Sequence, residues 1–195
     1  MEIKELIKNI EAWGIERELD KKGTVEGQQI KTAEEISELI KGISKNNLNL
    51  IKDSIGDVFV TLVIGNMLNH KLDLVKTYKE SNELVEENGE NITKEKDYKK
   101  DMIVCMASGI VDLLDGDYCE DNLNTILCNL IGICKVYDMT FIECVESAYN
   151  EIADRKGRMI NGTFVKEEDL ENWWISKKTW RIRIYSLGKL WANYS

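Results

Sequence analysis

Residues 48–69, LNLIKDSIGDVFVTLVIGNMLN, decide the fold class of this chain. The stretch has helical periodicity up to Asp57 and is apolar on nearly every side beyond it, which is typical of the central helix of a bundle. The segments on either side also repeat apolar residues three and four positions apart, and the chain contains no proline. The sequence therefore predicts an all-α fold, a helical bundle built around residues 48–69.

Further helices are expected around this central one, at residues 2–20, 28–44, 101–114, 122–136 and 140–156. Thr140 serves as the N-cap of the last of these helices. Residues 79–101 are highly charged without a buried stripe, so we expect a solvated helix end and loop there. GRMINGTF (157–164) is expected to be a loop. RIRIY (181–185) is expected to be a short strand or an amphipathic arm.

The length and composition fit one ordinary domain with a real core, since the chain has 195 residues, of which 43% are hydrophobic and 31% charged. Its longest apolar run, residues 58–68, is much shorter than the roughly 20 residues that span a bilayer. The first residues alternate charge with apolar side chains and lack the uninterrupted apolar segment of a signal peptide. We therefore expect a cytoplasmic protein without a membrane-spanning helix.

Charge is distributed unevenly along the chain. The formal net charge is −9, yet residues 172–195 carry five basic and no acidic residues, together with four of the five tryptophans. We expect this basic, Trp-rich tail to be an appendage of a domain that covers residues 1–171. The acidic balance argues against a protein that binds nucleic acid through its phosphates, and it raises the question of a bound cation.

The cysteines and the histidine exclude several kinds of site. The five cysteines contain no C-x-x-C pair and have no flanking histidines, so zinc binding is not expected and reduced, packed thiols are. His70 is the one histidine in the chain. It has no partner motif and is expected to be hydrogen-bonded or solvated, which excludes a His-based triad.

An acidic string lies in the helix expected at residues 28–44. KTAEEISE (31–38) places Lys31, Glu34, Glu35 and Glu38 within an arc of about 100° that borders an apolar stripe. Taken alone, such a string is most simply a solvated helix face.

A second acidic element changes this interpretation. Asp53 and Asp57 lie one turn apart at the start of the most apolar helix, and carboxylates that enter a buried helix need a partner. If the two helices pack antiparallel through the short KNNLN turn (45–49), their acidic turns face each other, and Gly56 leaves room for a close neighbour. Hard oxygen ligands of this kind suit Mg²⁺, so we expect a magnesium site.

A third group of polar residues follows the last expected helix. Asn150, Arg155, Lys156 and Arg158 put hydrogen-bond donors and cations near its end. They suit phosphate oxygens or a base edge, and they equally suit the dipole at a helix C-terminus.

Together these elements resemble a known family. Glu34-Glu35-x-x-Glu38 followed by Gly56-Asp57 looks like the E-E-x-x-E and E-x-x-D signature of the MazG-like, all-α nucleoside triphosphate pyrophosphohydrolases, in the form common in bacteriophages and Gram-positive bacteria. Trp13 with Arg17, Gln29-x-Lys31, and AYNEIADRKGRMINGTFVKE (148–167) look like the same subgroup. The resemblance covers about residues 1–70 and 122–168.

The chain departs from the family pattern in two places. Ser54 stands where the family has a glutamate three residues before the aspartate, and Asp53 lies one place earlier. An insertion, about residues 71–121, separates the two matching regions, so the domain is expected to be one bundle with a helical insertion.

The resemblance implies Mg²⁺-dependent hydrolysis of an NTP or dNTP to the monophosphate and pyrophosphate, with Mn²⁺ as a substitute metal. It implies metal ligands at Glu34, Glu35, Glu38, Asp53 and Asp57, with Glu35 and Glu38 also catalytic. Substrate contacts are implied for Trp13, Arg17, Lys31, Asn150, Arg155 and Lys156, and for Trp13 plain core packing is an equal alternative. A homodimer or homotetramer is implied as well. The alternative function is a non-catalytic helical binding module that acts through its insertion or tail.

Overall fold

The computed structural model describes residues 1–92, 98–160, 163–167 and 170, and its described part is predominantly helical. The all-α prediction is confirmed. The helices are α1 (Ile3–Glu16), α2 (Leu19–Lys22), α3 (Val25–Lys45), α4 (Leu48–Leu68), α5 (Leu74–Ile92), α6 (Tyr98–Asp115), α7 (Glu120–Val136) and α8 (Phe141–Ala153). A small hairpin of β1 (Gly157–Ile160) and β2 (Thr163–Lys166) follows them.

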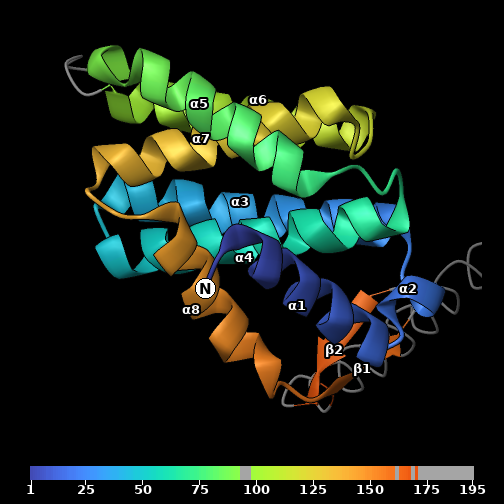
Figure 1. The fold of residues 1–195 in the computed structure, drawn as a ribbon. Helices are drawn as coiled ribbons and strands as arrows, with labels where there is room; N and C mark the ends of the chain where they lie inside the picture. The colour runs from blue at the N-terminus through green and yellow to red at the C-terminus, as the bar shows by residue number, and fades with distance from the viewer. Residues whose placement is uncertain (93–97, 161–162, 168–169, 171–195) are drawn as a thin grey trace, which may run out of the picture.

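The helices form three layers (Figure 1). The pair α3 and α4 lies in the middle, with α5, α6 and α7 on one side and α1 and α8 on the other. The hairpin and α2 lie beside the end of α1, so segments from both halves of the chain meet at one end of the lower layer.

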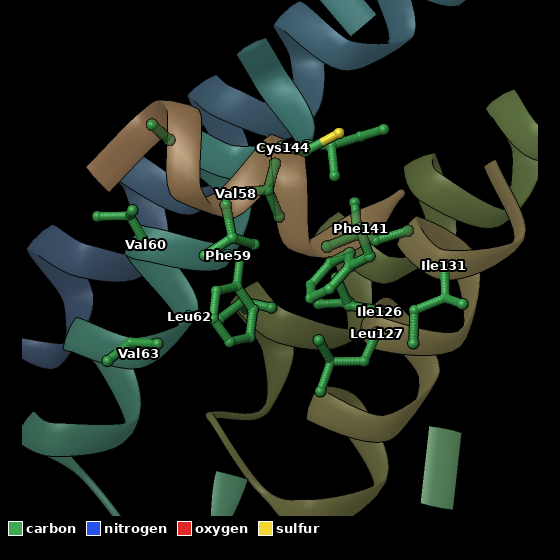
Figure 2. Packing of buried hydrophobic residues seen from close by; sticks show 14 of the residues in the cluster. Val58, Phe59, Val60, Leu62, Val63, Ile126, Leu127, Ile131, Phe141 and Cys144 are labelled. Carbon is green, nitrogen blue, oxygen red and sulfur yellow. The ribbon is translucent and has the colours of Figure 1, made fainter. Parts of the chain in front are cut away.

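The central pair has the predicted geometry. Asn46 adopts a left-handed conformation with φ of 53°, and the Asn47 side chain accepts a hydrogen bond from the Leu50 amide at 3.2 Å, so the chain reverses within the predicted turn. Helix α4 is buried nearly all round from Ser54 onward. Phe59 packs edge-on against Phe141 of α8, with ring centroids 5.2 Å apart (Figure 2).

The first two expected helices have different boundaries from the predicted ones. Residues 2–20 are not one helix, because α1 ends at Glu16 and Glu18 takes a left-handed φ of 59° before the single turn of α2. The next helix starts at Val25 rather than at residue 28, because the Thr24 hydroxyl accepts a hydrogen bond from the Gly27 amide at 3.1 Å and caps the helix there.

Residues 79–101 contain a buried stripe, contrary to the prediction, although the expected solvated helix end is present, since residues 83, 84 and 86–88 of α5 are exposed. Helix α5 runs through Ile92 and α6 already begins at Tyr98. The buried side of α5 is Leu74, Thr77, Ser81 and Val85, at spacings of three and four. Two of these four are polar, and Ser81 donates to the Asn124 side chain of α7 at 2.6 Å, so hydrophobicity alone did not reveal the stripe.

The loop expected at 157–164 is instead the start of the β-hairpin. The strands pair antiparallel, with Arg158 opposite Val165 and Met159 opposite Phe164. Asn161-Gly162 between two alternating segments is a strong sequence signal for a hairpin, and it was read only as a loop signal. The start behind Thr140 is confirmed, since its hydroxyl accepts from the Glu143 amide at 3.3 Å.

Several expectations fall outside the described residues, namely the strand or arm at 181–185 and the structure of the tail, residues 172–195. In the described part, no single helix has the length and apolarity needed to cross a membrane, and only the bent pair of α7 and α8 passes such a test together. His70 is exposed and its Nε2 lies 2.8 Å from Asp117 Oδ2, as expected for a satisfied histidine.

Candidate functional site

A cavity of about 550 Å³ opens between the middle and lower layers, a size within the usual range for small-molecule sites. Its walls come from α1, α2, α3, α4, α8 and β2. One part of the wall is charged, with Lys31, Glu34, Glu35, Glu38, Asp57, Glu151, Arg155 and Lys166. Another part is mostly apolar, with Trp13, Leu19, Val60, Ile64, Ile152 and Phe164.

The charged wall arises from the antiparallel register of α3 and α4. Glu35 and Glu38 of α3 line the same cavity as Asp57 of α4, and the charge of Glu35 acts on Asp57 and that of Glu38 on Asp53. The predicted convergence of the two acidic turns is therefore confirmed. Asp53 contributes to this field without lining the cavity itself.

Asp57 occupies the most unfavourable position for a negative charge. Burial raises the pKa of Asp57, and the nearby carboxylates of Glu35, Glu151 and Asp53 raise it further, to about 7, against a smaller opposing effect of Arg155. Among the described residues no hydrogen bond or ion pair reaches this carboxylate. A bound cation would therefore stabilise the charged form of this carboxylate more than that of an exposed carboxylate.

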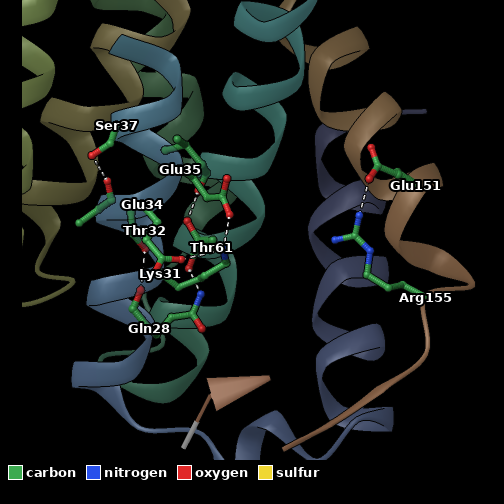
Figure 3. Close-up of polar contacts among 11 residues, drawn as sticks. Gln28, Lys31, Thr32, Glu34, Glu35, Ser37, Thr61, Glu151 and Arg155 are labelled. Carbon is green, nitrogen blue, oxygen red and sulfur yellow. Dashed lines mark hydrogen bonds and ion pairs between the residues drawn. The ribbon is translucent and has the colours of Figure 1, made fainter. Parts of the chain in front are cut away.

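Lys31 supplies positive charge to the same wall (Figure 3). Its Nζ lies 2.9 Å from Glu34 and 2.7 Å from Glu35, whose side chain is only 13% exposed. Burial lowers the pKa of Lys31, but hydrogen bonds to Glu35 and Glu34 outweigh this effect and leave the pKa raised. The ammonium group therefore stays protonated and neutralises part of the acidic wall.

The charged part of the wall also contains Glu151, contributed by α8, an acidic residue that the sequence reasoning missed. Glu151 forms an ion pair with Arg155, which lies just beyond the end of α8 (Figure 3). Like Glu35 beside Ile36, it directly precedes a buried isoleucine, Ile152, and this helical spacing is the signal that could have identified it. Its negative charge acts on both Asp53 and Asp57.

Gly56 allows α8 to approach the acidic wall. A Cβ at this position would lie 2.6 Å from the Ala148 Cβ and closer still to the Cys144 carbonyl oxygen. The expectation that Gly56 leaves room for a close neighbour is thus confirmed, and that neighbour is α8, the helix that carries Glu151 and leads into Arg155.

Trp13 belongs to the apolar wall, and its polar atom is already bonded. The indole Nε1 donates to the Ile152 carbonyl at 2.7 Å, and the ring meets Phe164 edge-on at 5.5 Å between centroids. Trp13 is 9% exposed, so it offers a small ring surface to the cavity and no free donor. Gln28 reaches the same region and donates from Nε2 to the Thr61 carbonyl at 3.2 Å.

Arg17 supports the wall and does not line the cavity. Its guanidinium donates to the carbonyls of Arg155 at 3.0 Å and Ala153 at 3.1 Å, at the end of α8, and lies 4.8 Å above the Trp13 ring. Asn150 and Lys156 are exposed and also lie outside the cavity lining. Of the predicted substrate contacts, the structure brings Trp13, Lys31 and Arg155 together.

The acidic residues have the chemistry of a metal site without its arrangement. In the described part of the chain, no three carboxylate, thiol or imidazole groups lie close enough together to hold a metal in their present conformations. The donor set itself suits a hard cation, because it consists of carboxylate oxygens around an unpartnered, part-buried Asp57. Lys31 now neutralises Glu34 and Glu35, the two carboxylates that a metal would compete for.

Comparison with known proteins gives one partial similarity. The chain is 48% identical over 69 residues to an uncharacterized 18.2 kDa protein from the rep–hol intergenic region of Haemophilus phage HP1, a match that covers 35% of this chain. The chain spans 42% of the length of that phage protein. No known family profile matches the chain, and no solved structure does.

Proposed function

We propose that the chain hydrolyses a nucleoside triphosphate, NTP or dNTP, to the monophosphate and pyrophosphate with the help of Mg²⁺. The observation that supports this most is Asp57, a part-buried carboxylate without a partner among the described residues. It shares the charged wall of the cavity with Glu35, and Lys31, Arg155 and Lys166 line the cavity as well. The magnesium ions would bring positive charge to the carboxylates of the acidic wall. The phosphates of the nucleotide would bring negative charge to the cationic side chains of the same cavity.

Magnesium would be held by Asp57, Glu35 and Glu38, with Glu34 and Asp53 at the edge of the set. Bound there, it would neutralise phosphate charge and make a water molecule more acidic, and Mn²⁺ would serve in its place. These carboxylates line one wall or act on it electrostatically, so small side-chain rotations rather than helix movements would gather them.

The chain's own residues would then orient the attack. Glu35 and Glu38 are the candidates to accept a proton from the attacking water, because both line the cavity with Asp57 on the wall that the triphosphate would face. Lys31, now engaged with Glu34 and Glu35, would move to a phosphate oxygen when metal takes its place. Arg155 and Lys166 would contact the phosphates that leave.

The apolar wall would hold the nucleoside. Trp13 and Phe164 present ring surface there, and Gln28 has a side-chain oxygen that its bond to Thr61 leaves available. The binding energy at this end would come from exclusion of water and ring contacts. Asn150, Arg17 and Lys156 would act indirectly, since none of them lines the cavity.

The test is a panel of NTPs and dNTPs with Mg²⁺, read out separately as pyrophosphate and phosphate. We expect pyrophosphate as the primary product, and we expect EDTA to abolish turnover without loss of helical circular dichroism. Glu83→Ala, at an exposed site on α5 away from the cavity lining, is the matched control for the acidic variants. Single phosphates as the primary product would contradict the proposed cleavage site.

A further inference from the structure

The mostly apolar part of the cavity wall also holds the polar side chains of Gln28 and Thr61, and we call this part the apolar end. The Thr61 hydroxyl donates to the Val58 carbonyl at 2.7 Å, and Gln28 Nε2 donates to the Thr61 carbonyl at 3.2 Å. Trp13 Nε1, the third polar group here, donates to the Ile152 carbonyl at 2.7 Å. All three side chains therefore spend a hydrogen on a carbonyl of the protein itself.

The chemistry of each group determines what it still offers to a ligand. An indole nitrogen only donates, so Trp13 has no hydrogen-bonding capacity left. A hydroxyl whose hydrogen is engaged keeps its lone pairs, and a glutamine with one amide hydrogen engaged keeps its oxygen and the other hydrogen. The Thr61 carbonyl can only accept, which fixes the amide with its nitrogen towards Thr61. Thr61 Oγ1 and Gln28 Oε1 are thus two acceptors beside a single remaining N–H.

The two acceptors lie beside each other, because the side chain of Gln28 is bonded to the backbone of Thr61 (Figure 3). Thr61 is only 6% exposed and Gln28 is half-buried. A ligand that displaces water from such atoms has to replace the lost hydrogen bonds. A ligand donor does so, whereas a ligand carbonyl would meet lone pairs at both oxygens.

The charged donors of the cavity belong to its other part. Lys31 and Arg155 form ion pairs with carboxylates of the charged wall. Lys166 lies opposite Gly157 in the hairpin, close in sequence to the end of α8. The cations are therefore gathered where the phosphates are proposed to bind, and the apolar end is left with acceptors.

The helical positions relate these acceptors to the acidic wall. Thr61 lies one turn after Asp57 on α4, and Gln28 lies two turns before Glu35 on α3. A nucleotide whose phosphates face Glu35 and Asp57 would therefore extend its nucleoside towards Gln28 and Thr61.

We propose that Thr61 Oγ1 and Gln28 Oε1 select the nucleotide through a hydrogen-bond donor of its nucleoside. The exocyclic amino group of cytosine or adenine supplies such a donor from the base, and the ribose 2′-hydroxyl supplies one from the sugar. Uracil carries a carbonyl oxygen where cytosine carries its amino group, so the two bases form a matched pair. The inference rests on the proposed function, because that function places the nucleoside at the apolar end.

CTP, UTP, dCTP and dUTP with Mg²⁺ test the proposal, since they differ only at the base substituent and at the 2′ position. We expect kcat/KM to be about 10- to 100-fold higher for CTP and dCTP than for UTP and dUTP, because the uracil oxygen would leave buried acceptors unpaired. A preference of this size for CTP and UTP over their deoxy counterparts would support the proposal with the donor on the sugar. Any other pattern, including equal values for all four, would overturn it.

Variants of Thr61 test whether this residue carries the selectivity. Thr61→Val keeps the shape and removes one acceptor, so the preference should fall about tenfold, while Thr61→Ser should retain it. Thr77→Val is the matched control, because Thr77 is 3% exposed on α5, bonds the Asp73 carbonyl at 3.1 Å and lies outside the cavity lining. Circular dichroism melting checks that the variants fold. An equal loss of kcat/KM for all four nucleotides in Thr61→Val, with an unchanged preference, would indicate a structural role and overturn the proposal.

A binding measurement separates this inference from the proposed function. The α,β-imido analogues of the four nucleotides cannot be cleaved between the α and β phosphates, and calorimetric titration gives their affinities. Tighter binding of the analogues with the extra donor, without turnover of any nucleotide, would support the selectivity and overturn the proposed hydrolysis. Turnover of all four nucleotides with equal affinities for the analogues would support the hydrolysis and overturn the selectivity. Absence of binding by all four analogues would overturn both.

Discussion

Helix α3 presents polar residues on two sides, and the two sides differ in how their polar atoms are satisfied. Towards the α6–α7 turn, Thr32 lies 2.9 Å from the Tyr118 hydroxyl and Gln29 donates to the Leu113 carbonyl at 2.6 Å. Towards the cavity, Glu35 faces the unpartnered Asp57. Both sides are partly or fully buried, so burial alone does not distinguish them.

The difference indicates which polar residues serve the fold and which are available to a ligand. A buried group with its hydrogen bonds made costs little and fixes one arrangement, and the Tyr118 set joins the outer layer to the central pair in this way. Crowded carboxylates cost stability unless something else compensates for them. We therefore expect the carboxylates at the cavity to serve a ligand, and the four expectations below test this contrast.

The largest expected effect concerns the cavity side. Glu38→Ala or Asp57→Ala should lower pyrophosphate release by several orders of magnitude, because loss of one carboxylate disturbs metal position and water activation together. Asp53→Ala should cost less, because Asp53 does not line the cavity. Steady-state kinetics of pyrophosphate release measures these losses, with Glu83→Ala as control. Turnover near the wild-type value in both Glu38→Ala and Asp57→Ala would refute the assignment of these residues to the catalytic site.

The next effect concerns the packed side. Gly65→Ala should destabilise the fold by about 3 kcal/mol, because its Cβ would overlap the fully buried Tyr118 ring. Gly109→Ala is the control, since its Cβ would lie 3.2 Å from a movable Ile126 side chain, and it should change stability by less than about 1 kcal/mol. Urea unfolding measures the free energy of unfolding of both variants. Equal losses in the two variants would mean that the Tyr118 ring can shift aside.

A smaller effect should appear as a pH dependence of the metal-free protein. The pKa of Asp57 is about 7 in the folded state and near 3.8 in the unfolded state, so between these values the folded state binds more protons. The free energy of unfolding therefore falls as pH rises through this window, by on the order of 2–4 kcal/mol, and the loss is complete above pH 7.

Asp57→Asn should remove that contribution. In EDTA, the variant should be more stable than wild type at pH 8, and the gap should shrink towards pH 4. Urea titrations at both pH values give the difference directly, and a gap that does not depend on pH would show that Asp57 has an ordinary pKa.

The smallest effect concerns the Tyr118 hydroxyl. Tyr118→Phe removes the contact with Thr32, whose hydroxyl still donates to the Gln28 carbonyl at 3.0 Å. We expect a loss of about 1 kcal/mol in stability with turnover unchanged. A large loss of turnover in a folded Tyr118→Phe would contradict the division between the two sides of α3.

The sequence was most informative where local spacing determines the outcome. Glu35 and Asp57 were expected to face each other because a short turn forces their helices to be antiparallel, and they do. The stripe of α5 was missed because Thr77 and Ser81 are buried through packing and hydrogen bonding to another helix, which periodic hydrophobicity does not register. Glu151 was missed although its spacing to Ile152 and Ala148 follows the rule that identified Glu35.

Hydrogen bonds between distant segments account for another difference between the predicted and the observed site. Arg17 was expected at the substrate, but it is bonded to carbonyls of α8 that lie more than 130 residues away in sequence, a pairing that no local pattern contains. The metal and the reaction remain predictions, and the experiments above address them.

The bond from Trp13 to the Ile152 carbonyl joins residues 139 positions apart and has a consequence for the order of assembly. The acidic α3–α4 hairpin is local and can form early as the chain leaves the ribosome, whereas the wall that carries Glu151, Arg155 and Phe164 is synthesised later. Until α8 docks on Gly56 and α1, the carboxylates of the nascent chain are exposed to water, where their mutual repulsion is weak. At that stage no closed cavity exists that could bind a triphosphate. The cavity is therefore a late product of synthesis, and a ribosome-stalled chain that ends before residue 141 should carry the acidic hairpin without a competent site.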